Sequence, residues 1–287
     1  MMSEAVETKS ALRFPRSVLL YAKLLYTFAR NSLIRDMTFR ANFIVEVISS
    51  MSWMVMNLGF YLLIFNYTGN IGGWEKNQFF VFIATTMLIN SLVQTFFMPN
   101  AQELSELVRT GGLDFALLKP VDTQFLISMR KMSWSSLGNF FVALLLLVYS
   151  VMRLEDGPPS LVAAVLYPVY VLTGVLILYS VMITLAATSI WLGRNQSLYD
   201  FWFYITNFSR YPMQIYDGRF GTPLRWTFTY LIPVLVVINV PAGLMAQPLE
   251  KQYWWLAAFA LLATAGSLLA SRWVFQRALG SYRSASS

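Results

Sequence analysis

The sequence predicts an all-α, polytopic membrane protein with six transmembrane helices. Of its 287 residues, 57% are hydrophobic and only 12% are charged, which is about half the charged share of a soluble globular domain. Several apolar stretches also reach the roughly 20 residues that a helix needs to cross about 30 Å of hydrocarbon. A soluble protein of this composition would expose larger apolar patches than monomers tolerate. We therefore expect an N-terminal segment at 1–40 and a single membrane domain at 41–287.

The composition also excludes several kinds of chemistry. The chain has no histidine and no cysteine, which removes disulfides, His-containing zinc sites and Ser-His nucleophile pairs. No GxxxxGK[ST] loop is present to hold a nucleotide phosphate. We expect no catalytic residue, metal site or cofactor in this chain. Its net charge of +7 comes from basic residues beside apolar spans, which favours anionic lipid headgroups over nucleic acid.

The segment 1–40 holds seven Lys or Arg residues and an amphipathic pattern. In "SVLLYAKLLYTFARNSLIRDMTFR", Leu20, Leu24 and Phe28 lie on neighbouring turns, with Lys23 and Arg30 between them. This pattern is typical of a helix that lies in the membrane interface. The alternative interpretation is that the segment forms the inner end of a tilted first span.

Hydropathy and charge together predict the path of the chain through the membrane. The fourth span is too long for one perpendicular helix and should tilt, kink at Pro168 or project. If residues 1–40 are cytoplasmic, six crossings place fifteen Lys and Arg residues inside and six outside, as the positive-inside rule requires. Both termini are then cytoplasmic. The predicted spans are 41–66, 78–98, 135–152, 160–192, 197–213 and 253–275.

A further apolar stretch, 226–246, is broken by Pro233 and Pro241. A full crossing here would put the basic C-terminal tail outside, against the charge rule. We therefore expect 210–248 to form a re-entrant pair of short helices in the outer leaflet. The prolines and Asn239 suit backbone that is buried in protein and does not face lipid.

The loop 99–134 between the second and third spans is much longer than the roughly 2–8 residues that join two helices. Ala101–Thr110 has a helical pattern, and the following Gly111-Gly112 should end it, because glycine adopts the left-handed conformation at little cost. Asp114 and Asp122 are expected to cap two further helices. The loop either docks on a cytoplasmic partner and transmits force, or it packs as a cap on its own bundle.

The order of these features resembles the permease subunit of type-2 ABC exporters, in a bacterial subgroup. The resemblance extends from about Ser17 to Arg283, and the second glycine of Gly111-Gly112 departs from the family pattern. Three stretches carry it: "RTGGLDFALLKP" at Arg109–Pro120, "SRYPMQIYDG" at Ser209–Gly218 and "YLIPVLVVINVPAGLM" at Tyr230–Met245.

This resemblance implies an ATP-driven export permease in the bacterial cytoplasmic (inner) membrane, which is not itself an enzyme. Two cytoplasmic ABC ATPase subunits would bind ATP and Mg, and a second permease, identical or related, would complete a dimer. The substrate path would run between the two permeases. The expected contact residues for the ATPase are Glu103, Glu106, Leu107, Arg109, Thr110, Gly111, Gly112, Leu113 and Asp114.

Four residues are candidates for the substrate path: Glu46, Met54, Arg210 and Tyr211. A carboxylate in a span is costly unless it is paired, so Glu46 either contacts a cationic or polar substrate or pairs with Arg40 or Arg35. Arg210 either clamps an anionic group or extends to outer phosphates. The soft side chain of Met54 suits an adaptable path, although such residues also face lipid.

Two other classes of protein are compatible with a polytopic membrane chain. An ion-coupled secondary transporter usually has titratable residues near the midplane and an internal repeat. Only Glu46 comes near this requirement, and the sequence shows no repeat. A membrane scaffold without transport is the second alternative.

Overall fold

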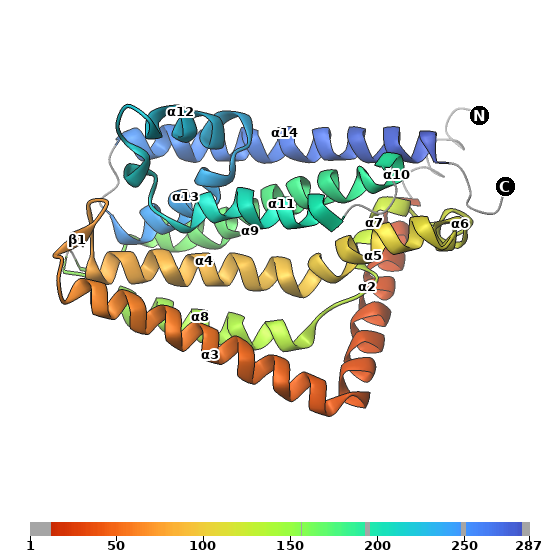
Figure 1. Cartoon of the computed structure of the whole chain (residues 1–287), viewed down its shortest axis with the longest axis horizontal. Coiled ribbons are helices and arrows are strands. Elements are labelled where there is room, and N and C mark those ends of the chain that lie inside the picture. Colours follow the sequence, from red (N-terminus) through yellow and green to blue (C-terminus); the bar gives the residue numbers. More distant parts are fainter. Residues whose placement is uncertain (1–12, 156, 193–195, 248–250, 283–287) are drawn as a thin grey trace, which may run out of the picture.

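A computed structural model describes residues 13–155, 157–192, 196–247 and 251–282 of the chain. The long helices run side by side along the bundle, and one helix lies across its end (Figure 1). We call the end that carries α2 (Arg13–Thr38) and α6 (Gly112–Leu117) the α6 end, and the opposite end, with the small β-hairpin and α12 (Gly221–Trp226), the hairpin end. The N-terminal residues 1–12 of the predicted 1–40 segment lie outside the described residues.

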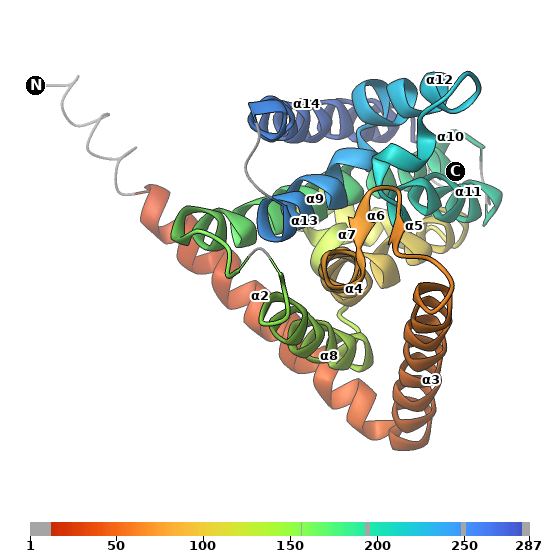
Figure 2. The same ribbon diagram turned by 90° about the vertical axis from the view of Figure 1, so that its left-hand side faces the viewer.

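The first described helix, α2 (Arg13–Thr38), lies across the α6 end, and α3 (Arg40–Phe65) then turns along the bundle (Figures 1 and 2). The break falls at Phe39, whose φ of −104° and ψ of 55° are not helical. The side chain of Asp36 accepts a hydrogen bond from the amide of Trp134, and the Trp134 indole donates to the carbonyl of Ala29. These bonds tie α2 to the start of α8. The expected separate N-terminal helix is therefore present.

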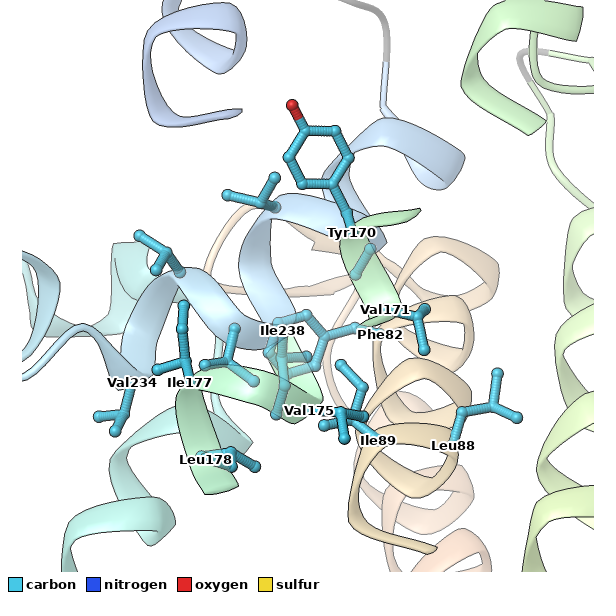
Figure 3. Packing of buried hydrophobic residues seen from close by; sticks show 14 of the residues in the cluster. Phe82, Leu88, Ile89, Tyr170, Val171, Val175, Ile177, Leu178, Val234 and Ile238 are labelled. Carbon is cyan, nitrogen blue, oxygen red and sulfur yellow. The ribbon is translucent and has the colours of Figure 1, made fainter. Parts of the chain in front are cut away.

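The core lies where α4 (Lys76–Phe96), α9 (Leu161–Ala187) and α13 (Val234–Ala246) meet. Phe82 and Ile89 from α4 lie against Val175 from α9 and Ile238 from α13 (Figure 3), and all four side chains are buried. At Gly174 the backbones come so close that an added Cβ would lie 2.8 Å from the carbonyl oxygen of Val237. Small residues allow such close contacts between membrane helices.

Among the described residues, five helices are long and apolar enough to cross a membrane. Together with one bent helix pair, the count reaches six. The fold is thus the all-α polytopic class that the sequence predicts. The five spans are Arg40–Phe65, Lys76–Arg109, Trp134–Val151, Leu161–Leu192 and Trp254–Ser281, which belong to α3, α4 with α5 (Met98–Arg109), α8 (Trp134–Val151), α9 with α10 (Ser189–Leu192), and α14 (Lys251–Ser281).

The predicted fifth span, 197–213, is not one continuous long helix, and this expectation was wrong. The helix α11 (Gln196–Asn207) has only 12 residues, and two 3₁₀ turns follow it, η1 (Phe208–Arg210) and η2 (Met213–Tyr216). Pro212 lacks an amide hydrogen and forces the preceding residue to be extended. Tyr211 accordingly has a φ of −124° and a ψ of 148°. The chain nevertheless passes from α10 at the α6 end to α12 at the hairpin end (Figure 1).

The long fourth span continues through Pro168 without ending and breaks at Thr188. With α10 it covers 32 residues, or about 48 Å at the helical rise. That length exceeds the roughly 30 Å of hydrocarbon. The α10 end packs on α5 and α14, so the excess length supports the α6 end.

The segment expected to form a re-entrant hairpin contains a bent helix pair, α12 (Gly221–Trp226) with η3 (Thr227–Leu231) on one side and α13 on the other. The bend between them is 88°, a geometry shared by a broken span and a re-entrant loop. The break falls at Ile232-Pro233. Asn239 in α13 is buried, and its side-chain oxygen accepts a hydrogen bond of 2.8 Å from the amide of Met213. Pro241 is also buried, so α13 is enclosed by protein, whereas α12 has no buried residue.

A small β-hairpin, β1 (Asn70–Ile71) and β2 (Trp74–Glu75), connects α3 to α4. Its turn uses Gly72 and Gly73, both with positive φ. The indole of Trp74 donates a hydrogen bond of 3.3 Å to Gln214 in η2. The β-hairpin is thereby held against η2.

Candidate functional site

The first candidate site is the segment that projects at the α6 end. The helix α5 ends at Arg109, with Thr110 as its C-cap, because Gly111 adopts a φ of +72°, which glycine tolerates. A second short helix, α6 (Gly112–Leu117), starts at once. Gly111 occupies the capping position of α6 and Asp114 lies in its first turn, so the prediction that Asp114 caps this helix was wrong. A carboxylate in the first turn still interacts favourably with the helix dipole.

Some of the predicted contact residues point inward at this end. Leu113 is fully buried (0% exposed) and packs in a cluster with Leu104, Ile183 and Phe275, which come from α5, α9 and α14. Leu107 is partly buried against the same cluster, and Glu103 forms a 2.7 Å ion pair with Lys131. These side chains hold the segment to the bundle, whatever binds outside it.

Other predicted residues face outward. The side chains of Glu106 and Arg109 are both about half exposed and form an ion pair, and Thr110 lies beside them. Two exposed apolar residues here were not among those expected from the sequence: Phe115 in α6 is 73% exposed, and Leu118, the C-cap of α6, is 82% exposed. A signal was available, because "LDFALLKP" is apolar on both faces of a helix that can bury only one of them.

A polar network links the base of this segment to the spans. Asp122 caps α7 (Thr123–Met129) by accepting a 2.9 Å hydrogen bond from the amide of Phe125, as predicted. Arg272 from α14 binds both Asp122 and Gln124 at 3.0 and 3.1 Å. The hydroxyl of Tyr179 in α9 accepts a 3.0 Å hydrogen bond from Gln124. These hydrogen bonds connect α7 directly to α9 and α14, so a movement of α7 would displace or break contacts with both helices.

The pKa of Asp122 gives a first testable prediction. Burial alone would raise this pKa, but the hydrogen bonds from Arg272 and the Phe125 amide outweigh burial and lower it. A carboxyl group with a lowered pKa stabilises the fold above its unfolded pKa of about 3.9 and loses this effect as the pH falls. We expect Asp122→Asn, which keeps the cap, to melt about 2–4 °C below the wild type at pH 7. The difference should shrink as the pH falls toward 3 in thermal melts of the detergent-solubilised protein; a constant difference would contradict it.

The second candidate site is a cavity of about 900 Å³ between α3, α4 and α8. Figure 2 shows α3 and α14 on opposite sides of the bundle, and Met54 is the only side chain of α3 that is buried. One face of α3 lines the cavity with side chains three or four residues apart, which is the spacing of a single helix face. These side chains are Glu46, Ser49, Ser50, Trp53, Asn57 and Tyr61.

The opposite walls of this cavity are also polar. Thr86, Asn90 and Gln94 lie one turn apart on α4, and Ser135 and Asn139 lie one turn apart on α8. Two hydrogen bonds cross between the walls at the α6 end. The hydroxyl of Ser135 donates to the Glu46 carboxylate at 2.6 Å, and the amide of Asn139 donates to Ser50. We call this polar cavity the α3 cleft.

The α3 cleft brings the predicted path residues together. Glu46, Met54 and Arg210 line it, and Tyr211 interacts with the hydroxyl of Tyr61, another lining residue.

Of the two alternatives for Glu46, the ion pair with Arg40 or Arg35 is not formed among the described residues. Arg35 instead binds its neighbour Asp36 and the carbonyl of Met132. Arg40 donates to the carbonyl of Met37.

These features define a class of protein: a multi-pass helical membrane protein with a polar cleft along one span and a projecting helical segment at one end. The particular family follows from comparison. The family model described as "ABC-2 family transporter protein" matches residues 51–286, and the chain belongs to this family. Comparison with curated proteins and with solved structures found no match. Membership makes the chain an ABC permease, which implies ABC ATPase subunits as partners.

Proposed function

We propose that this chain is the membrane permease of an ATP-driven exporter, and that the α3 cleft forms its half of the substrate path. The observation that carries the proposal is the polar lining of the cleft. Serine, asparagine, glutamine and charged side chains line a cavity beside α3, a helix that is otherwise apolar and exposed. Polar groups at membrane depth are costly and usually face a bundle interior or a water-filled path.

A second permease would complete this path. The face of α3 beyond the cleft exposes large apolar residues such as Ile48, Val55 and Phe60, while the cleft itself is polar. A second copy of the chain, or a related permease, placed over α3 would shield the polar walls from lipid. Two ATPase subunits, one for each permease, would then stand at the α6 end, which we assign to the cytoplasmic side of the inner membrane.

The ATPase partner would bind ATP and Mg, and this chain would respond mechanically. Closure of the ATPase dimer can shift the permease only through a differential affinity for its two states. The geometry offers a short route, because α5 continues from α4 as one 34-residue stretch, Lys76–Arg109. The amide of Phe97 at their junction binds the carbonyl of Val93 at 2.9 Å. A push on α6 would thus reach, through α5, the wall of the cleft that α4 forms.

The decisive experiment is reconstitution of the permease with its ABC ATPase in proteoliposomes. Export should require ATP, and Arg109→Ala should reduce transport relative to ATP hydrolysis. If the ATPase does not associate with the permease, the proposal fails. Transport that proceeds without ATP would instead support the ion-coupled alternative.

The chain lacks cysteine, so single cysteines provide a second test, of the cleft itself. We expect Asn57→Cys in the α3 cleft to react with a membrane-impermeant maleimide, because a polar cleft admits water. Val55→Cys is the matched control, since Val55 lies on the same helix but outside the cleft, on its apolar face, where it is 65% exposed. Labelling of Asn57→Cys should change when ATP is added to the complex. Equal labelling of both positions would contradict a water-filled path along this face.

A further inference from the structure

The two ends of the α3 cleft carry charges of opposite sign. Four charged side chains line it in the described part of the chain. The neighbours Arg35 and Asp36 form an ion pair of 3.2 Å and cancel each other. Glu46 then remains near the α6 end and Arg210 near the other end of the cleft. Glu46 lies about 9 Å along α3 from its first residue, at the helical rise.

The carboxylate of Glu46 has unused binding capacity. Its hydrogen-bond donor is the hydroxyl of Ser135, at 2.6 Å, whereas an ionised carboxylate can accept at about four positions. No Lys or Arg in the described ranges forms an ion pair with it. A carboxylate at this depth is costly without a cationic partner. A positively charged ligand in the cleft would supply that partner.

The next two turns of the same wall are suited to an apolar body. Trp53 lies two turns beyond Glu46 on the lining face of α3, and Met54 lies beside it. Met87 from α4 also lines the cleft. Aromatic and thioether side chains provide adaptable apolar contact. An anionic ligand would meet the Glu46 carboxylate here and be repelled.

We propose, resting on the export function above, that the cargo is a lipophilic cation. Its positive group binds Glu46, and its apolar body lies against Trp53, Met54 and Met87. Arg210, at the far end of the cleft, disfavours retention of a cation that has moved past Glu46. Glu46 is thus a specificity-determining residue for entry, and Arg210 promotes release.

The test uses two probes of nearly equal size and opposite charge, tetraphenylphosphonium and tetraphenylborate. Binding to the full-length permease in nanodiscs, without ATPase, is measured by equilibrium dialysis. We expect saturable binding of the cation, at least about tenfold tighter than that of the anion. Glu46→Gln should weaken cation binding by about tenfold or more, as expected for the loss of one charged contact, and should not weaken anion binding. Glu155→Gln, an exposed glutamate outside the cleft, is the matched control and should change neither.

Several outcomes would overturn the inference. Binding of the cation that Glu46→Gln leaves unchanged would do so, as would equal binding of both probes or no binding of either. Trp53→Ala provides an independent variant and should weaken both probes alike, because it removes apolar contact and no charge. A permease that binds the cation as described but associates with no ATPase would overturn the export function alone. A complex that hydrolyses ATP but ignores the cation would overturn only the present inference.

Discussion

Replacement of Gly174 by leucine should prevent the bundle from assembling correctly. An added Cβ alone would lie 2.8 Å from the backbone oxygen of Val237 and 3.0 Å from the end of the Ile89 side chain. The Val237 oxygen belongs to α13, which is buried along nearly its whole length, so it has little room to move. Overpacking of a tight core costs about 1–3 kcal/mol and sometimes more. For three additional carbon atoms beyond Cβ we expect the upper end of this range or a loss of folded protein.

The measurement is the yield of monodisperse protein by size-exclusion chromatography, followed by a thermal melt. Gly266→Leu is the matched control, because Gly266 also lies in a membrane helix but an added Cβ would have no neighbour within 4 Å. Gly174→Ala should fall between the two. If Gly174→Leu folds and melts like the wild type, the close packing of α9 on α13 is incorrect.

The break in the 226–246 stretch and most of the spans follow from local chemistry. Hydropathy over 20 residues identifies a long apolar helix without knowledge of its neighbours. Pro233 stands where the helical backbone is interrupted, and it lacks the amide hydrogen that would continue the helix. The capping role of Asp122 is equally local, since it depends on an amide three residues away. Such features can therefore be predicted from the sequence alone.

Features that depend on residues far apart in the sequence were not predicted. Arg35 was expected as a partner of Glu46, but Asp36 is its immediate neighbour and competes for it. The hydrogen-bond donor of Glu46 is Ser135, which is 89 residues away in the sequence. The walls of the α3 cleft also come from three helices. Spacing along one helix indicates which side chains share a face, but not which helix that face meets.

The outer face of α6 was missed for another reason. Its six residues are too few for a clear hydrophobic period, so the sequence does not indicate which apolar side chains are buried. The structure separates them: Leu113 and Ala116 are buried, whereas Phe115 and Leu118 are exposed. The exposed pair is therefore available to a partner protein.

The double substitution of Phe115→Asp with Leu118→Asp should abolish assembly with the ABC ATPase. Buried aromatic and aliphatic anchors at the centre of an interface each contribute about 2 kcal/mol or more, so two together correspond to a loss of affinity of about 1,000-fold. The fold should be unaffected, because both side chains are largely exposed in the chain alone. Affinity is measured with the purified ATPase by biolayer interferometry. Tyr67→Asp, an exposed aromatic position near the hairpin end, is the matched control and should bind normally.

This experiment also separates the two interpretations of the 99–134 loop. In a segment that only packs on its own bundle, a phenylalanine and a leucine exposed to water add no stability. Exposed apolar groups of this kind are instead costly in water. For such a cap, two aspartates would be neutral or would improve solubility, and the ATPase would still bind. For a docking segment, the same two charges would face an apolar pocket on the partner and would have to be desolvated there. The two interpretations therefore predict opposite results, and retention of ATPase binding by the double variant would exclude the docking role of α6.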